Sequence, residues 1–191
     1  MTQWERFLDT FFKWDVIVQY LPAIGRGFVV TCELAVLVVI CGISLGLILA
    51  LIRSYQIKII NFFIICLVDI LRSLPPLVLI LLFYFGLPNV GLNFSGFMVV
   101  ILVLSFVLGA FAEEIFWAGI TSIHKGQWEA SRSTGLGYSQ TLVYVILPQA
   151  IRMTIPPLTN RTIAITKNTA LGMVVGVGEI LNQATIAQSF S

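Results

Sequence analysis

One stretch of this sequence is apolar for long enough to cross a lipid bilayer. It runs from Gly27 to Ile52 and is interrupted by a single charge, Glu33. A helix rises by about 1.5 Å per residue and needs about 20 apolar residues to span the hydrocarbon core, so this stretch can cross with some tilt. The whole chain follows the same trend, because only 10% of its 191 residues are charged, whereas soluble domains carry about 25%. We therefore expect an integral membrane protein.

Three further apolar stretches predict three more spans. They run from Ile59 to Leu87, from about Phe94 to Trp117 and from Leu142 to about Leu171. The first contains the pair Pro75-Pro76 in its middle, and proline removes a backbone donor and clashes with the preceding turn. We expect that span to be kinked or broken near mid-depth. The predicted fold is an all-α membrane protein, one domain over residues 1–191, with four complete spans.

Basic residues in the loops orient the chain. Lysine and arginine are enriched in cytoplasmic loops of membrane proteins. The loop after the first span holds Arg53 and Lys58, the loop after the third holds Lys125 and Arg132, and the loop of residues 86–95 holds no charge. This alternation predicts an external N-terminus and two cytoplasmic basic loops.

Polar side chains within the fourth span indicate a solute path. On a helix, successive residues turn by about 100°, so Asn160 and Lys167 share one face and Arg161 and Asn168 share the neighbouring one. Charges inside a span usually face a bundle interior, a cavity or each other. The alternative is that they form interhelical hydrogen bonds or extend to the interface. The same choice applies to Arg72, which precedes the proline pair and could simply pair with Asp69 within one helix.

Two adjacent carboxylates end the third span. Glu113 and Glu114 are candidate gate residues, and the alternative is that they are charges at the level of the membrane interface. The chain has no G-x-x-x-x-G-K-[ST] loop, no H-E-x-x-H pair and no paired cysteine spacing, so we expect no ATP hydrolysis, metal or cofactor in it. The net charge of +2 is too small to suggest a nucleic-acid partner.

A longer motif lies in the polar stretch that follows the third span, at about residues 121–141. Glu129-Ala130-Ser131 is followed after three residues by Gly135 and, nine residues later, by Val145-Ile146-Leu147-Pro148. This spacing resembles the EAA motif of the permease subunits of ABC importers: E-A-A, three residues, G, nine residues, I-x-L-P. In those proteins the segment is a coupling helix that docks on a separate ATPase, and here the resemblance assigns that role to Glu129, Ala130, Ser131, Arg132 and Gly135.

Other segments resemble the polar amino acid permeases of the histidine and glutamine type within that family. They are Leu71-Arg72-Ser73-Leu74-Pro75 (R-G-T-P in the family), Ala112-Glu113-Glu114-Ile115 (A-E-I), Pro156-Pro157-Leu158-Thr159-Asn160 (P-P-L-x-N) and Lys167-Asn168-Thr169-Ala170-Leu171 (K-D-T-S-L). Ser73 and Leu74 replace the family's Gly-Thr, Trp117 stands where the family often has arginine, and Asn168 replaces its aspartate. The family also continues into a fifth span after a segment like Gly178–Leu181, and we expect that this chain lacks it.

The resemblance implies a permease subunit of an inner-membrane importer that moves a polar amino acid, acidic or neutral, inward by alternating access. The implied partners are ABC ATPase subunits, which bind ATP and magnesium, a second permease subunit and an external solute-binding protein. The alternatives are a permease for another solute, such as methionine or an osmolyte, and an ATP-independent channel or structural membrane subunit. The predicted substrate pathway consists of Arg72, Ser73, Asn160, Arg161, Lys167, Asn168 and Thr169.

Overall fold

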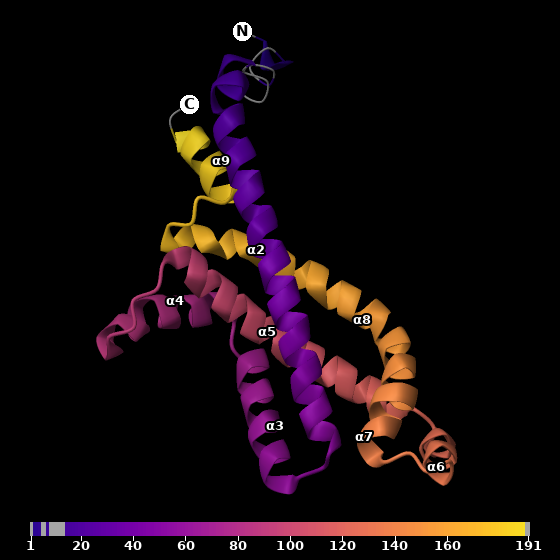
Figure 1. Cartoon of the computed structure of the whole chain (residues 1–191). Coiled ribbons are helices and arrows are strands. Elements are labelled where there is room, and N and C mark those ends of the chain that lie inside the picture. The colour runs from indigo at the N-terminus through magenta and orange to yellow at the C-terminus, as the bar shows by residue number, and fades with distance from the viewer. Residues whose placement is uncertain (1, 5–6, 8–13, 190–191) are drawn as a thin grey trace.

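A computed structural model of the chain describes residues 2–4, 7 and 14–189, and every regular element in this part is a helix (Figure 1). The first long one, α2 (Trp14–Ser54), runs along most of the molecule. It is followed by α3 (Lys58–Ser73), α4 (Pro76–Gly86), a short 3-10 turn η1 (Leu87–Val90) and α5 (Gly96–Ser122). The second half of the chain consists of α6 (Lys125–Ser133), α7 (Tyr138–Thr141), a π-helical stretch η2 (Leu142–Ile146), α8 (Leu147–Lys167), the 3-10 helix η3 (Asn168–Val175) and α9 (Ile180–Ser189).

Two of these helices, α2 and α5, are each long and apolar enough to cross a membrane alone. Two bent pairs pass the same test together: α3 with the segment 76–90, and the segment Tyr138–Val175 with α9. If each bent pair counts as one span, the described residues contain four, in agreement with the number predicted.

The break predicted at the proline pair is close to a right angle. The two halves of that span meet at 102°. Leu74 is extended, with φ −91° and ψ 136°, because a residue that precedes proline is disfavoured in the helical region. The chain therefore leaves α3 at Ser73 and restarts as α4 at Pro76, where the missing N–H of proline costs no intrahelical hydrogen bond.

The centre of the bundle is α5, which packs against α2, α3, α4 and α8. Its contact with α2 is close, because a Cβ atom added to Gly46 would lie 2.5 Å from the Cβ of Ala112, and one added to Gly42 would lie 2.8 Å from that of Leu108. Small residues at such a spacing let two helix backbones approach. The Gly42-x-x-x-Gly46 pair is therefore a packing surface for α5.

The segment after the fourth predicted span forms a helix that the sequence analysis did not expect. Helix α9 lies beside the first half of α2, at the end of the molecule opposite α6 (Figure 1). The buried carboxylate of Glu179 accepts hydrogen bonds from the backbone N–H groups of Leu181 and Asn182 at 2.8 and 2.7 Å, and the hydroxyl of Thr31 accepts one from Ile180. A carboxylate that accepts hydrogen bonds from the free N–H groups of a first turn stabilises the start of a helix, so Glu179 caps α9 and Thr31 joins α9 to α2.

Candidate functional site

A cavity of about 400 Å³ lies at the break between α3 and α4, and we call it the broken-span cavity. Helices α5 and α8 complete its wall. Its polar lining comes from Arg72, Ser73, Arg161 and Asn168, and the rest is apolar: Leu74, Pro75, Pro76, Val107, Phe111, Ala164 and Ile165. Non-helical backbone at membrane depth is tolerated where it lines a cavity or is buried in protein, which is the case here.

Two arginines from different helices share one aromatic ring in this cavity. The guanidinium carbon of Arg161, on α8, lies 3.5 Å from the ring centroid of Phe111, and that of Arg72, at the end of α3, lies 5.2 Å from it. A ring face attracts cations, so Phe111 holds two like charges near each other. Within the described part of the chain, Arg161 forms no ion pair.

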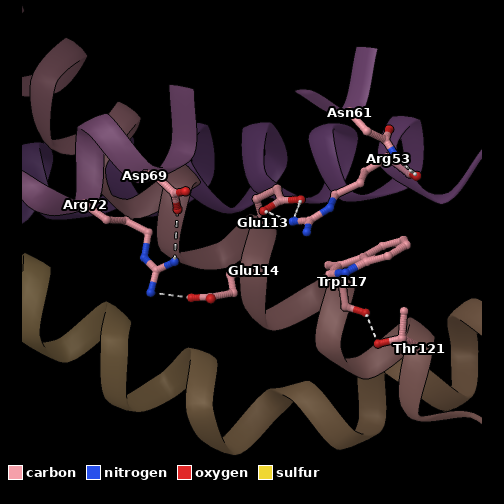
Figure 2. A network of polar contacts seen from close by, with 8 residues as sticks. All are labelled: Arg53, Asn61, Asp69, Arg72, Glu113, Glu114, Trp117 and Thr121. Carbon is pink, nitrogen blue, oxygen red and sulfur yellow. Dashed lines mark hydrogen bonds and ion pairs between the residues drawn. The ribbon is translucent and has the colours of Figure 1, made fainter. Parts of the chain in front are cut away.

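Arg72 has a partner across the helix interface. Its Nη2 atom lies 2.5 Å from Oε2 of Glu114 on α5, whereas the distance from its Nη1 to the carboxylate of Asp69 on its own helix is 4.0 Å (Figure 2). The pairing with Asp69 that the sequence favoured is thus the weaker of the two. The Nε atom of Arg72 is buried and has no hydrogen-bond partner among the described residues.

The neighbouring carboxylate, Glu113, turns to a different arginine. Its side chain is fully buried, and its two carboxylate oxygens accept hydrogen bonds from Nη1 of Arg53 at 3.0 and 3.2 Å (Figure 2). The Arg53 guanidinium carbon lies 4.7 Å from the ring centroid of Trp117. Arg53 was placed in a loop by the sequence analysis, but it lies in the last turn of α2 with its charge turned into the bundle. The orientation of the chain therefore rests on Lys58, Lys125 and Arg132.

The structure divides the predicted pathway residues. Arg72, Ser73, Arg161 and Asn168 come together at the broken-span cavity, whereas Asn160 and Lys167 are exposed and do not line it. Thr169 is buried, and its hydroxyl donates a hydrogen bond to the carbonyl of Thr166 at 2.8 Å. Asn160 and Lys167 share one face of α8, Arg161 and Asn168 share the neighbouring face, and only the second face lines the cavity.

The predicted coupling helix is α6, a separate short helix at the end of the molecule that also holds the α2–α3 turn (Figure 1). Glu129, Ala130 and Arg132 are exposed on it, whereas Ser131 is buried and donates its hydroxyl hydrogen to the carbonyl of Gln127 at 2.7 Å. Gly135 follows with φ +94°, a left-handed conformation that favours glycine at the end of a helix. Three of the coupling candidates thus present an accessible face.

An aromatic contact attaches α6 to the bundle. Trp128 stacks on Tyr138 with ring centroids 5.2 Å apart, and the Tyr138 hydroxyl donates a hydrogen bond to the carbonyl of Ser54 at the end of α2. Tyr55 lies beside the same ring, and its hydroxyl is 3.0 Å from that of Ser139. A displacement of α6 would therefore act directly on the end of α2, one residue from Arg53.

The sequence analysis missed Phe111, Arg53 and Tyr138. The spacing could have indicated Phe111 alone, because Phe111 and Glu114 are three residues apart and share a helix face. No spacing rule links Arg53 to Glu113 or Tyr138 to Ser54, since these contacts join distant parts of the chain.

Comparison with known proteins finds one family model and many relatives. Residues 42–191 match the model described as "Binding-protein-dependent transport system inner membrane component". The chain is 34% identical over 168 residues to the "Probable glutamine ABC transporter permease protein" of Bacillus subtilis, and this alignment covers 88% of this chain and 77% of the relative. It is 37% identical over 179 residues to the glutamate transport system permease protein of Corynebacterium efficiens, covering 86% and 78%. A crystal structure of an amino acid ABC transporter with histidines superposes with a TM-score of 0.81 at 36% identity, covering 91% of this chain and 81% of that one.

Proposed function

The chain belongs to the family of binding-protein-dependent transport system inner membrane components and is a permease subunit of an amino-acid ABC importer, and we propose that it passes an acidic or neutral amino acid through the broken-span cavity. The observation that carries this proposal is the placement of Arg72 and Arg161 over one ring in the cavity wall, with Glu114 at 2.5 Å and Asp69 at 4.0 Å as the carboxylate partners of Arg72 among the described residues. Every amino acid offers an α-carboxylate, and an arginine fork binds carboxylates with two parallel hydrogen bonds.

The local charge supports acidic or neutral substrates over lysine or arginine. Arg72 and Arg161 contribute two positive charges to the lining, which holds no carboxylate, and the carboxylates of Glu114 and Asp69 contact Arg72 from outside it. A cationic side chain would meet repulsion in this place, whereas a second carboxylate or an amide would not.

The exposed face of α6 supports docking on an ATPase subunit. Because the chain has no phosphate-binding loop, ATP and magnesium belong to that partner, and its closure moves α6. Through Tyr138 the movement reaches α2, and the two facing states of the permease exchange. A second permease subunit and an external solute-binding protein complete the assembly, with the N-terminus of this chain outside and α6 in the cytoplasm of the bacterial cell.

Transport by the reconstituted assembly tests the proposal. The permease, its ATPase subunits and its binding protein are placed in proteoliposomes, and ATP-dependent uptake of labelled glutamate and glutamine is measured with a twentyfold excess of each unlabelled amino acid in turn. We expect competition by acidic and neutral polar amino acids and none by lysine or arginine. Uptake that no polar amino acid inhibits, or that methionine alone inhibits, would overturn the substrate assignment.

A further inference from the structure

We propose that Glu114 is a displaceable counter-ion of Arg72, whose place on the guanidinium is taken by the carboxylate of the transported amino acid. This inference rests on the proposed function, because it assumes that the broken-span cavity binds substrate. Glu114 then competes with the substrate carboxylate for the Arg72 guanidinium and thereby lowers the affinity for substrate.

The two adjacent glutamates of α5 differ in the freedom that displacement requires. Glu113 is fully buried and bonded to Arg53 through both carboxylate oxygens, so leaving Arg53 would break two contacts and leave a buried charge unpaired. The side chain of Glu114 is 49% exposed and is held by a single contact to Arg72 at 2.5 Å. The Arg72 side chain is 28% exposed, so this pair is only partly buried, and Glu114 can leave Arg72 more easily than Glu113 can leave Arg53.

The position of Arg72 makes it accessible from two sides. Arg72 lines the broken-span cavity, whereas Glu114 does not, so the carboxylate of Glu114 approaches the guanidinium from outside the cavity wall. The Nε atom of Arg72 is buried without a partner among the residues described. A guanidinium offers five N–H donors, and one contact to Glu114 leaves several for an incoming carboxylate.

The exchange of Glu114 for a substrate carboxylate keeps the charge of Arg72 balanced in both states. In the empty cavity Glu114 partly neutralises two neighbouring guanidinium groups. A bound carboxylate takes over this role, and Glu114 moves away from Arg72. When substrate leaves, Glu114 returns to Arg72, which prevents an unpaired charge and lowers the affinity for the departing amino acid. A transporter must bind substrate weakly enough to release it, and an internal competitor provides this.

The test measures equilibrium binding of labelled L-glutamate to the purified complex of permease and ATPase subunits in lipid nanodiscs. Glu114→Gln removes the competing charge, and Glu114→Asp keeps the charge but withdraws it by one methylene group. Asp69→Asn is the matched control, since it removes a carboxylate on the same guanidinium at 4.0 Å. We expect both Glu114 variants to bind glutamate about three- to fivefold more tightly than the wild type, and Asp69→Asn to bind as the wild type does.

Each outcome separates this inference from the function on which it rests. If Glu114→Asp matches the wild type while Glu114→Gln binds more tightly, only net charge matters and displacement is wrong. Unchanged affinity in both Glu114 variants also overturns it. If the wild type binds neither glutamate nor glutamine, or if Arg161→Ala binds as well as the wild type, the broken-span cavity is not the substrate site and the proposed function itself fails.

Discussion

Arg53, in the last turn of α2, places a guanidinium nitrogen 3.0 Å from the fully buried carboxylate of Glu113 on α5. The pair joins the two longest apolar helices close to the end of the bundle that holds α6 (Figure 1). The same guanidinium lies 4.7 Å from the ring centroid of Trp117, so the carboxylate and the ring of α5 hold one charge of α2.

Removal of one partner of this pair will destabilise the fold. Glu113→Ala leaves the Arg53 charge buried without its carboxylate, which costs about 3–5 kcal/mol in comparable cases. We expect a clear drop in the midpoint of thermal unfolding of the detergent-solubilised permease. The double variant Arg53→Met with Glu113→Leu replaces the pair by apolar groups of similar size and should recover most of the loss. A single variant as stable as the wild type would contradict the structural role of the pair.

The close contact of α2 with α5 predicts that Gly46 tolerates no side chain. The Cβ atom of Gly46→Ala would lie 2.5 Å from the Cβ of Ala112 and 2.7 Å from the carbonyl oxygen of Gly109. Forcing these backbones apart should cost about 1–3 kcal/mol, measured as the unfolding midpoint. Gly25→Ala on the same helix meets no atom within 4 Å and is the control. Equal stability of the two variants would contradict the close packing of α2 on α5.

The spans and the break at the proline pair were predictable from the sequence, because the length of an apolar stretch and the effect of proline on a helix depend only on neighbouring residues. The size of the bend was not predictable, since it depends on how α4 packs against α5 and η3 after the chain turns at Leu74. Helix α9 was missed for a similar reason. Its apolar pattern is weak, and its hydrogen bond with Thr31 joins residues 149 positions apart, which no local rule connects.

Replacement of Gly135, the residue in left-handed conformation after α6, will weaken the docking of α6 on the ATPase subunit. Gly135 has φ +94°, and alanine in this region costs about 1–2 kcal/mol, which should displace the end of α6. We expect Gly135→Ala to reduce both co-purification of the ATPase subunit and ATP-dependent uptake, as Glu129→Ala should through loss of an exposed contact. Gly137→Ala, two residues further on, is the control, because its φ of −68° suits any residue. If Gly135→Ala retained full ATPase association and uptake, α6 would not be the coupling helix.

Cysteine labelling will establish the orientation of the chain. In a background where Cys32, Cys41 and Cys66 are replaced by alanine, Asn89→Cys lies in the uncharged loop and Ser133→Cys lies on α6. A membrane-impermeant maleimide should label Asn89→Cys in intact cells and Ser133→Cys only after the membrane is permeabilised. The reverse pattern would show that the basic loops are external.

The candidate site was predicted in part. Arg72, Arg161 and Asn168 were chosen because they are polar residues inside spans, and the structure brings them to one cavity. The sequence placed Asn160 and Lys167 on one helix face and Arg161 and Asn168 on the neighbouring one, but it did not indicate which face lines the cavity, because that depends on how α8 packs against α5. Phe111 is an ordinary apolar residue by composition, and only its position between two guanidinium groups distinguishes it.

A charge reversal at Arg161 tests most directly whether the broken-span cavity carries the substrate. Arg161→Glu should lower uptake of glutamate relative to lysine in proteoliposomes by about tenfold or more, because a charge-assisted contact is replaced by repulsion. Arg152→Glu makes the same change at an exposed position of α8 that does not line the cavity, and should leave the preference as it is in the wild type. A shift toward lysine in Arg161→Glu alone is the predicted result. An unchanged preference in Arg161→Glu, in a complex that still transports, would contradict the assignment of this cavity to the amino acid.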